Sequence, residues 1–196
     1  MWTLQSLFIL LNAFCVAAVN AQGCSGLAPV LLQASWAAQL GWAASFDVSG
    51  WTGVTCNSTT GSLSIELSNR NLSGSLPDAW SAASQLSQLN ISNNKLTGTL
   101  PNVWGNFNQL LSLDVGVNNI TGTLPSSWAN MTQLQVLGLS TNQLVGSLPE
   151  AWSNLTNLAG LNLGSNRLKG ALPDSWSGFA SVSHCCDLIT ITVYIK

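Results

Sequence analysis

The sequence predicts an α/β solenoid, a stack of short coils in which every coil contributes one strand. Proline, tryptophan and glycine each recur at intervals of 24 residues through the middle of the chain, from Pro77, Trp80 and Gly74 onward. Such a fixed period is typical of a tandem repeat array. Only 6% of the 196 residues are charged, whereas 46% are hydrophobic. An ordinary domain carries about 25% charged residues, so uncharged polar side chains must cover the surface.

The first 21 residues are predicted to be a signal peptide. The stretch from Leu7 to Val19 is a 13-residue apolar run interrupted only by Asn12, and small residues then precede a cleavage position before Gln22. A membrane-spanning helix needs about 20 residues, so this run suits a signal peptide better. An uncleaved anchor is the alternative. We expect a secreted, cell-surface or cell-wall protein without a membrane span in this chain, although a longer form could be membrane-anchored.

Each repeat unit is expected to begin with a short strand that ends in an asparagine turn. Leu89 and Ile91 lie two residues apart, which buries one face of a strand and leaves Asn90 outside. Asn94 follows where the chain must turn, and its side-chain amide can satisfy backbone groups left unpaired there. Stacked units should align these side chains into a structural ladder of Asn94, Asn118, Asn142 and Asn166.

The second half of each unit should return along the back of the coil. Gly98 permits a tight bend, Pro101 rigidifies the return, and Trp104, Phe107 and Leu110 are spaced three apart, as in a 3₁₀ segment. The repeated tryptophans have two interpretations: aromatic platforms for sugar rings along the back, or bulky core residues. We favour the core, because tryptophan is highly buried on average.

The pattern Leu-x-x-Leu-x-Leu-x-x-Asn-x-Leu-x-Gly-x-Leu-Pro resembles the plant-type leucine-rich repeat found in receptor kinases and receptor-like proteins. The resemblance implies a right-handed superhelix with short parallel strands on the concave side and 3₁₀ or irregular segments on the convex side. Trp51 to Cys56 is similar to the end of such proteins' amino-terminal cap, and residues 28–42 to the helix of that cap. We therefore assign 22–61 to the cap and 62–182 to five repeats.

The cysteines and the last segment depart from the family pattern. The mature chain keeps Cys24, Cys56, Cys185 and Cys186, an even set that can form disulfides in an oxidising compartment. The family usually has a cysteine just before Trp51; because it is missing here, Cys56 either pairs with Cys24 or stays free. The repeat fails after 182. Residues 183–196 are expected to be an irregular tail: either this tail is an irregular cap, or the chain is a truncated form of a longer array. Residues 188–195 alternate as a strand does.

The sequence gives little support for catalysis, metal binding or nucleic-acid binding. Five Lys and Arg against seven Asp and Glu leave no basic block for phosphates. The segment from His184 to Asp187 offers adjacent ligands that point to opposite faces of a strand, so we expect no metal and no cofactor. Glu66 and Asp114 occupy the same column two strands apart, near 10 Å, which exceeds the window of about 6.5–9.5 Å for an inverting glycosidase. We expect no enzymatic activity.

The concave face is the predicted binding surface for a protein, peptide or polysaccharide. Its outward strand positions are polar and mildly acidic in the early units, and the candidate ligand-binding residues are Glu66, Gln88, Asn90, Asn93 and Asp114. Six Asn-x-Ser/Thr sequons predict a glycoprotein: Asn57, Asn71, Asn90, Asn119, Asn130 and Asn154. A glycan on Asn90 would lie on the binding face itself.

Three functions follow from this reading. The first is an extracellular or cell-surface module that recognises a partner non-covalently through its concave sheet, as the resemblance to receptor ectodomains implies. The second is a structural cell-wall or matrix glycoprotein, in which uncharged repeats and glycans matter more than a ligand. The third is a proteinaceous inhibitor of a wall-degrading glycosidase, a role that some relatives of this repeat type have.

Overall fold

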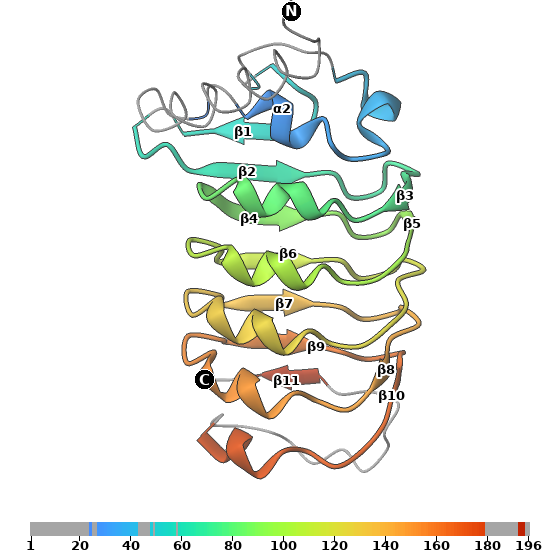
Figure 1. Cartoon of the computed structure of the whole chain (residues 1–196), viewed down its shortest axis with the longest axis vertical. Coiled ribbons are helices and arrows are strands. Elements are labelled where there is room, and N and C mark those ends of the chain that lie inside the picture. Colours follow the sequence, from blue (N-terminus) through green and yellow to red (C-terminus); the bar gives the residue numbers. More distant parts are fainter. Residues whose placement is uncertain are drawn as a thin grey trace, which may run out of the picture.

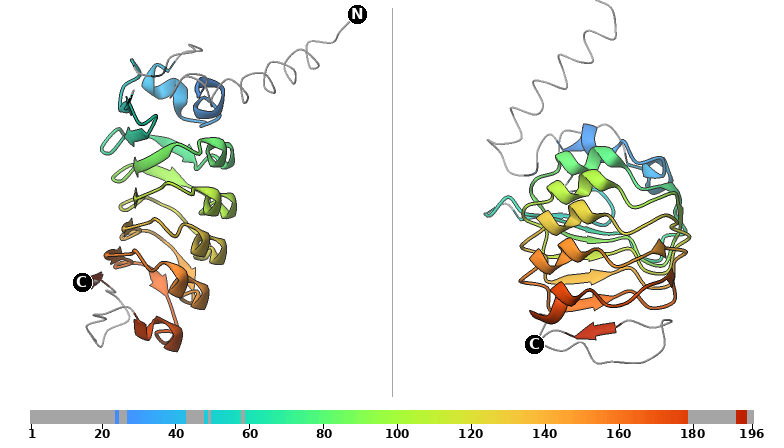
Figure 2. Two further views of the ribbon diagram at one scale, coloured as in Figure 1. Left: turned by 90° about the vertical axis from the view of Figure 1, so that its left-hand side faces the viewer. Right: turned by 60° about the horizontal axis from the view of Figure 1, so that its bottom comes forward.

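The protein is a stack of similar coils with a sheet on one side and short helices on the other (Figure 1). The computed structural model describes Cys24, residues 27–42, Val48, and residues 50–57, 59–178 and 192–194. The predicted signal peptide and the segment from 184 to 187 lie outside these residues. Each coil returns to a point one strand further along the stack, as the two turned views make clear (Figure 2). The α/β solenoid predicted from the 24-residue period is therefore confirmed.

The amino-terminal cap contains two short helices where one was expected over 28–42. These are α2 (Ala28–Leu31) and the 3₁₀ helix η1 (Ala37–Leu40), which ends at Gly41 with a left-handed φ of 69°. Trp36 lies between these two helices and is fully buried in the core. Its Nε1 donates to the Ser75 carbonyl at 3.2 Å. The helix expected over 28–42 is therefore interrupted between Leu31 and Ala37, in the segment that buries Trp36.

A disulfide joins Cys24 to Cys56, the alternative that the sequence left open. Cys56 ends β1 (Val54–Cys56), so the bond ties the start of the described cap to the first strand of the sheet. The ring of Trp42 stacks on that of Trp51, with centroids 4.9 Å apart, beneath the same segment. These two contacts brace the cap itself, and its rings of Trp36 and Trp42 pack on Trp80 of the first coil, with centroids 5.1 and 6.4 Å away.

The main sheet has seven strands in the order β1-β2-β4-β6-β7-β9-β11. Its five central strands are parallel, and residues 24 apart pair from coil to coil, as Leu89, Leu113 and Leu137 do. These strands are β2 (Leu63–Glu66), β4 (Leu86–Asn90), β6 (Ser112–Asp114), β7 (Val136–Gly138) and β9 (Gly160–Asn162). The period of the sequence is thus the register of the sheet.

Antiparallel strands close both edges of this parallel stack. β1 pairs with β2 at one edge, and β11 (Thr192–Tyr194) pairs with β9 at the other. β11 falls within the stretch 188–195 that alternates as a strand, so the tail expected to be irregular contributes an ordered element. Unpaired N–H and C=O groups at a sheet edge invite association with another chain, and the edge strands here, β1 and β11, are only three residues long.

Short strands along a second side of the coils were missed by the sequence analysis. They are β3 (Ser73–Ser75), β5 (Lys95–Thr97), β8 (Val145–Gly146) and β10 (Arg167–Leu168). Their partners are 22 residues apart rather than 24, as in the pairing of Ser75 with Thr97. The offset is already present where Ser73 pairs with Lys95, and it continues beyond the positive-φ Gly98 in the bridge of Thr99 with Thr121.

On the side opposite the main sheet, each coil forms one short 3₁₀ helix, which directly follows a proline. The helices are η2 (Asp78–Ala82), η3 (Asn102–Asn106), η4 (Ser126–Asn130), η5 (Glu150–Asn154) and η6 (Asp174–Gly178). Pro77, Pro101, Pro125 and Pro149 precede the first four of these helices in an extended conformation. The predicted 3₁₀ spacing of the back segment is observed.

The repeated tryptophans form a buried stack inside these helices. All five have no exposed surface, so they are core residues and not platforms for sugar rings. From Trp104 to Trp176 successive rings stack with centroids 6.2–6.4 Å apart. From Trp104 onward each indole Nε1 also donates to a proline carbonyl one coil earlier, as Trp128 does to Pro101 at 2.9 Å, whereas Trp80 donates to the Leu31 carbonyl of the cap at 3.2 Å. The indole thus fills the core and satisfies a buried backbone acceptor at the same time.

The turn asparagines make a second line of side-chain bonds between coils. Asn118 accepts from the Leu96 N–H of the preceding coil at 3.0 Å, and its Nδ2 donates to the carbonyls of Ile91 and Val115 at 3.1 Å. Asn94, Asn142 and Asn166 repeat the arrangement. In the first unit Arg70 stands in place of an asparagine, and Asn94 accepts from the Arg70 N–H at 3.1 Å.

Candidate functional site

The outer side of the parallel strands presents polar side chains that no other described part of the chain covers. Three positions of each coil point outward on this side, those equivalent to Ser64, Glu66 and Ser68 in the first unit, and we call this surface the sheet face. Their inward neighbours, Leu63, Ile65 and Leu67, are almost fully buried. The alternation arises because successive residues of a strand point to opposite faces.

Glu66 and Asn90 are joined on neighbouring strands of the sheet face. They are paired in register on β2 and β4, and the Asn90 Nδ2 donates to Glu66 Oε2 at 2.8 Å. Burial opposes ionisation of Glu66, but hydrogen bonds from Ser68 and Asn90 outweigh that effect and lower the pKa of the carboxyl. The nearby Arg70 acts in the same direction. Glu66 is therefore a well-satisfied carboxylate.

Asp114 continues the same column on β6 but in a different environment. Its Oδ1 accepts from the Gly116 N–H at 2.8 Å. The carboxylate lies over Gly138 of the next strand, where an added Cβ would be only 2.6 Å from Oδ1. Burial raises the pKa of Asp114; the Gly116 bond opposes the shift and the Glu66 charge adds to it. Gly138 thus provides the space in which this carboxylate rests against the sheet.

The column of the sheet face that begins at Ser64 changes from polar to apolar along the stack. Ser64 donates to Gln88 Oε1 at 3.4 Å on the first two strands. Further along, Val136 stands in this column with 47% of its surface exposed, and it is followed by Gly160. The early coils therefore offer hydrogen-bonding groups in this column, whereas the later coils offer the apolar side chain of Val136 beside a glycine.

Each outer strand is followed by a residue in the left-handed conformation, with φ between 53° and 57°. Asn93 and Asn69 tolerate this conformation and bond to each other through their side chains. Val117 and Thr141 adopt it too, although β-branched residues rarely do. Bonds between coils hold them there, because the Val117 N–H donates to the Ser140 carbonyl at 2.8 Å. Val117 is 45% exposed beside the sheet face.

Four of the five candidate binding residues lie on the sheet face, and one lies at its margin. Glu66, Gln88, Asn90 and Asp114 point outward from β2, β4 and β6, whereas Asn93 follows β4 at the left-handed turn. Sequence reasoning did not select Gly138 or Val117 as members of the site. A glycine at an outward strand position was the available signal for the first; for the second the sequence gives no signal, because valine is an ordinary strand residue.

The predicted glycosylation sites lie mostly away from the sheet face. Asn57, Asn71, Asn119, Asn130 and Asn154 are exposed on the cap, on the second side of the coils or beside the 3₁₀ helices. Asn90 is the exception: it is half-buried, its Nδ2 is bonded to Glu66, and its Oδ1 accepts from the Ser92 N–H and Oγ. Glycans on the five exposed sites would leave the sheet face uncovered.

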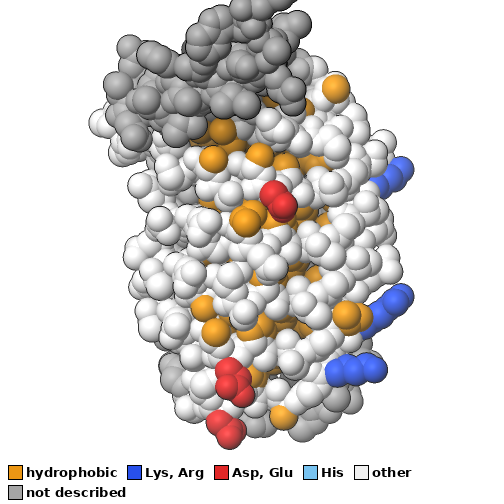
Figure 3. Space-filling view, in the orientation of Figure 1, with side chains coloured by type: hydrophobic (Ala, Val, Ile, Leu, Met, Phe, Trp, Pro, Cys, Tyr) orange, Lys and Arg blue, Asp and Glu red, His pale blue; other side chains and the backbone are white. Residues whose placement is uncertain are grey.

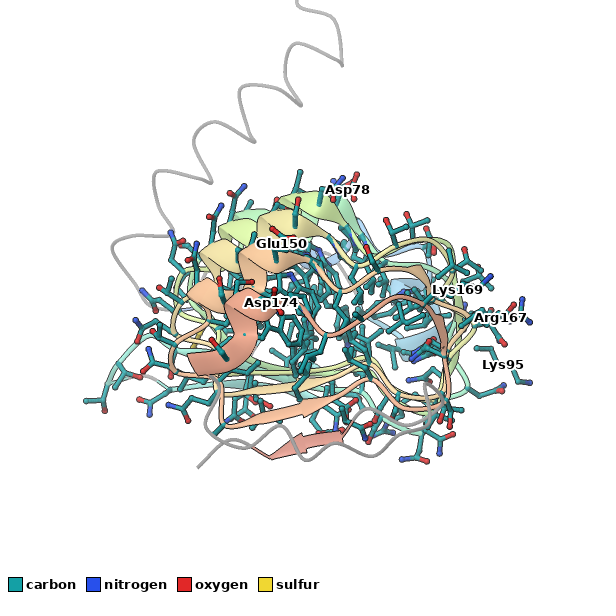
Figure 4. All side chains as sticks on the ribbon, turned by 90° about the horizontal axis from the view of Figure 1, so that it is seen from below. Asp78, Lys95, Glu150, Arg167, Lys169 and Asp174 are labelled. Atoms are coloured by element: carbon teal, nitrogen blue, oxygen red, sulfur yellow. A yellow bond between two sulfur atoms is a disulfide. The ribbon has the colours of Figure 1, made fainter. Side chains whose placement is uncertain are left out.

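The remaining charges lie on other sides of the molecule. Asp78, Glu150 and Asp174 project from the helical side, and Lys95, Arg167 and Lys169 point outward at the edge formed by β5 and β10 (Figure 4). The space-filling view shows the same separation, with basic groups along one edge and acidic groups over the helices (Figure 3). Among the described residues, no three His, Cys, Asp or Glu side chains gather as metal ligands.

The fold and the sheet face define a class of repeat solenoid with a polar parallel sheet on one side and proline-led 3₁₀ helices on the other. Residues 84–144 match the leucine-rich repeat family. The chain is a leucine-rich repeat protein of the plant type, which confirms the resemblance of its repeat pattern. No helix within the described ranges is long and apolar enough to cross a membrane.

Several solved plant structures share this architecture. The ectodomain of the Arabidopsis thaliana membrane receptor kinase GASSHO1/SCHENGEN3 is 32% identical, with a TM-score of 0.68 over 71% of this chain. The A. thaliana BIR2 ectodomain is 27% identical, with a TM-score of 0.63 over 87% of this chain. That of the A. thaliana receptor kinase SOBIR1 is 29% identical, with a TM-score of 0.64 over 75% of this chain.

The similar structures differ greatly in length. This chain corresponds to 17% of the GASSHO1/SCHENGEN3 chain, but to 86% of BIR2 and 83% of SOBIR1. No curated protein sequence gives a significant match. The likeness therefore establishes the fold and the repeat type, while the partner has to be argued from the surface of this chain.

Proposed function

We propose that the chain is an extracellular, non-catalytic recognition module that binds a peptide or protein segment on its sheet face. The observation that carries the proposal is the contrast between the two sides of the parallel strands. Inward side chains complete a continuous core, whereas outward groups stand in register at strand spacing without a covering element among the described residues. A repeat solenoid creates an extended surface of this kind, and such surfaces are commonly used for binding.

Two further findings support a polypeptide partner. Similar receptor structures were solved as complexes: GASSHO1/SCHENGEN3 with CASPARIAN STRIP INTEGRITY FACTOR 2, and RGFR1 with RGF2. In this chain, five of the six sequons lie off the sheet face, so glycans at those five would shield the other sides. The sixth, Asn90, lies on the face with its side chain bonded to Glu66 and Ser92. Among the described residues, the titratable side chains on the sheet face are Glu66 and Asp114, and their place two strands apart favours binding over acid–base catalysis.

A glycan placed on the sheet face would test the proposal. Gly164→Ser creates a sequon at Asn162, an exposed residue of β9, and serine already stands at the equivalent positions 68, 92 and 140. Asn108→Thr creates a matched sequon at Asn106 on the helical side, in the same column as Asn130 and Asn154. Glycopeptide mass spectrometry would verify that each new site is occupied.

The binding measurement uses peptides selected from an unbiased display library on the secreted, glycosylated protein. We expect Gly164→Ser to weaken their binding at least about tenfold, as steric exclusion from the site requires, and Asn108→Thr to leave it unchanged. If the two glycans weaken binding equally, or if no selected peptide responds to the glycan at Asn162, the sheet face is not the recognition surface.

A further inference from the structure

We propose that the segment bound on the sheet face is basic, with a Lys or Arg side chain seated against Asp114. The inference rests on the proposed function and adds the chemistry of the partner. It concerns the whole outward surface of β2, β4, β6 and β7, which no described element covers, and the choice of occupant follows from charge complementarity.

In the part of the chain that the structure describes, the sheet face carries negative charge and no positive charge. Glu66 and Asp114 are its charged residues, and the basic side chains Lys95, Arg167 and Lys169 point away at another edge of the stack (Figure 4). Arg70, at the end of the first coil, interacts with Glu66. Complementary charge across an interface steers association and disfavours wrong partners, so an acidic segment is excluded and a basic one is favoured.

Asp114 is the carboxylate that is ready to receive the cation. Glu66 already accepts bonds from Asn90 and from the Ser68 N–H, the latter at 3.0 Å, whereas Asp114 uses only Oδ1, for Gly116. No Lys or Arg of the described chain pairs with Asp114. A half-buried carboxylate without a cation gains more from a charge-assisted hydrogen bond than a solvated one does.

The surroundings of Asp114 suit a long basic side chain. Gly116 and Gly138 have no side chains that could cover the carboxylate, which itself fills the space over Gly138 and lies beside Ser140. Two exposed valines flank it: Val117 three residues further along the same coil, and Val136 two residues before Gly138 on the next strand. Lys and Arg bury their aliphatic stems against such apolar groups while the charged end reaches a polar partner.

The spacing of the two carboxylates indicates an extended polypeptide that runs along the stack. Glu66 and Asp114 are separated by two strand spacings, about 9.6 Å. In a polyproline II segment, residues three apart lie on the same side and are separated by about 9.3 Å. Two basic residues in an i, i+3 relation therefore match Asp114 and Glu66 together.

The test uses the synthetic peptide Ac-Pro-Pro-Arg-Pro-Pro-Arg-Pro-Pro-NH₂, its counterpart with Glu in place of Arg, and the full chain. Binding is followed by fluorescence anisotropy at low and at high ionic strength. We expect the arginine peptide to bind and Asp114→Asn to weaken its binding about tenfold, as the loss of a charge-assisted pair does. In Asp114→Asn, peptide binding should also depend less on ionic strength than it does in the wild type. The control is Asp78→Asn, which removes the same charge from the helical side and should change nothing.

Asp114→Asn is expected to fold normally, because asparagine already occupies this column at Asn90 and Asn162. In both places the Oδ1 accepts from the N–H two residues on at 3.1 Å, the bond that Asp114 makes to Gly116. A melting temperature no lower than that of Asp78→Asn verifies this.

Equal loss of binding in the two variants, or equal binding of the glutamate peptide, would overturn the inference. Failure of the proposed function looks different. If library peptides respond to the glycan at Asn162 but are not enriched in Lys or Arg and ignore Asp114→Asn, the recognition surface stands and the basic partner does not. If nothing responds to that glycan, both are wrong.

Discussion

At the residue scale, two carboxylates in one column show how local contacts decide charge behaviour. Glu66 and Asp114 have the same repeat position, yet the pKa of the first is lowered and that of the second is raised. The difference comes from the neighbour along the stack. Glu66 meets the Asn90 amide, a donor, whereas Asp114 lies over Gly138, which offers no side chain and lets the carboxylate settle into partial burial.

The raised pKa of Asp114 predicts how stability depends on pH. The folded state holds the Asp114 proton more tightly than the unfolded state, whose pKa is near the ordinary 3.8. Ionisation therefore costs folding free energy as the pH rises through the window between the two pKa values. We expect Asp114→Asn to match the wild type in acid and to be more stable at neutral pH, by no more than about 1 kcal/mol because the site is partly open to water.

Urea denaturation from acid to neutral pH would measure this difference. Glu66→Gln is the matched comparison and should behave in the opposite way: its pKa is lowered, so ionised Glu66 adds stability above its ordinary pKa of 4.5 and loses that contribution as the pH falls. If Asp114→Asn were less stable than the wild type at neutral pH, the raised pKa of Asp114 would be contradicted.

At the element scale, the 3₁₀ helices depend on the tryptophan that each one carries inward. A helix of five residues has little stability of its own, since short helices are marginal in water. Here Trp128 packs between Trp104 and Trp152, with centroids 6.3 and 6.4 Å away, and bonds to the Pro101 carbonyl. The proline that starts one helix is therefore held by the tryptophan of the next.

Two substitutions at Trp128 would separate packing from hydrogen bonding. Trp128→Ala should lower the free energy of unfolding by about 3–5 kcal/mol, the usual cost of emptying a buried aromatic site. Trp128→Phe keeps most of the stack but leaves the Pro101 carbonyl without this donor; we expect about 1–3 kcal/mol from the lost bond in addition to a smaller packing loss. Chemical denaturation measures both.

Val103→Ala, on the exposed side of η3, serves as the control and should stay within about 0.5 kcal/mol of the wild type. If Trp128→Ala were no more damaging than this control, the stack would not be the support of the helical side. The same experiment would then reopen a surface role for the tryptophans.

At the scale of the whole molecule, the stack depends on how its ends are closed. Each coil contacts only its neighbours, so stability is close to a sum of terms between adjacent coils, and an end coil has half of them. One end is reinforced by β1 and by the disulfide from Cys24 to Cys56. At the other end β11 covers the free edge of β9.

Removal of the disulfide should therefore destabilise the cap first. The bond closes a separation of 32 residues, for which the loop-entropy relation gives about 2–4 kcal/mol. We expect the double variant Cys24→Ser, Cys56→Ser to unfold at lower urea concentration and to lose amide protection in β1 and β2 before β6 and β7, as native-state hydrogen exchange would reveal. Uniform loss of protection along all strands would show that the cap is not the weaker end.

Much of this protein was predictable because its contacts repeat. Any contact between positions 24 apart recurs up to four times among the five units, so the period revealed the register of Leu89 with Leu113, the helical back of each coil and the burial of the tryptophans. Contacts that occur once carry no such signal. The break between α2 and η1 and the antiparallel placement of β11 each depend on packing in one place. The 22-residue offset of β3 and β5 recurs at β8 and β10, but it differs from the 24-residue period of the sequence.

The same division holds for the surface. The sequence alone determined that Glu66, Asn90 and Asp114 share one outward column, since strand alternation and the period place them there. Only the tertiary structure decided that Asp114 rests over Gly138, that Val117 is held in a left-handed conformation by its neighbouring coil, and that Cys56 pairs with Cys24. The physical reason is that these features are set by which atoms a neighbour presents, whereas a repeat period specifies only which residues become neighbours.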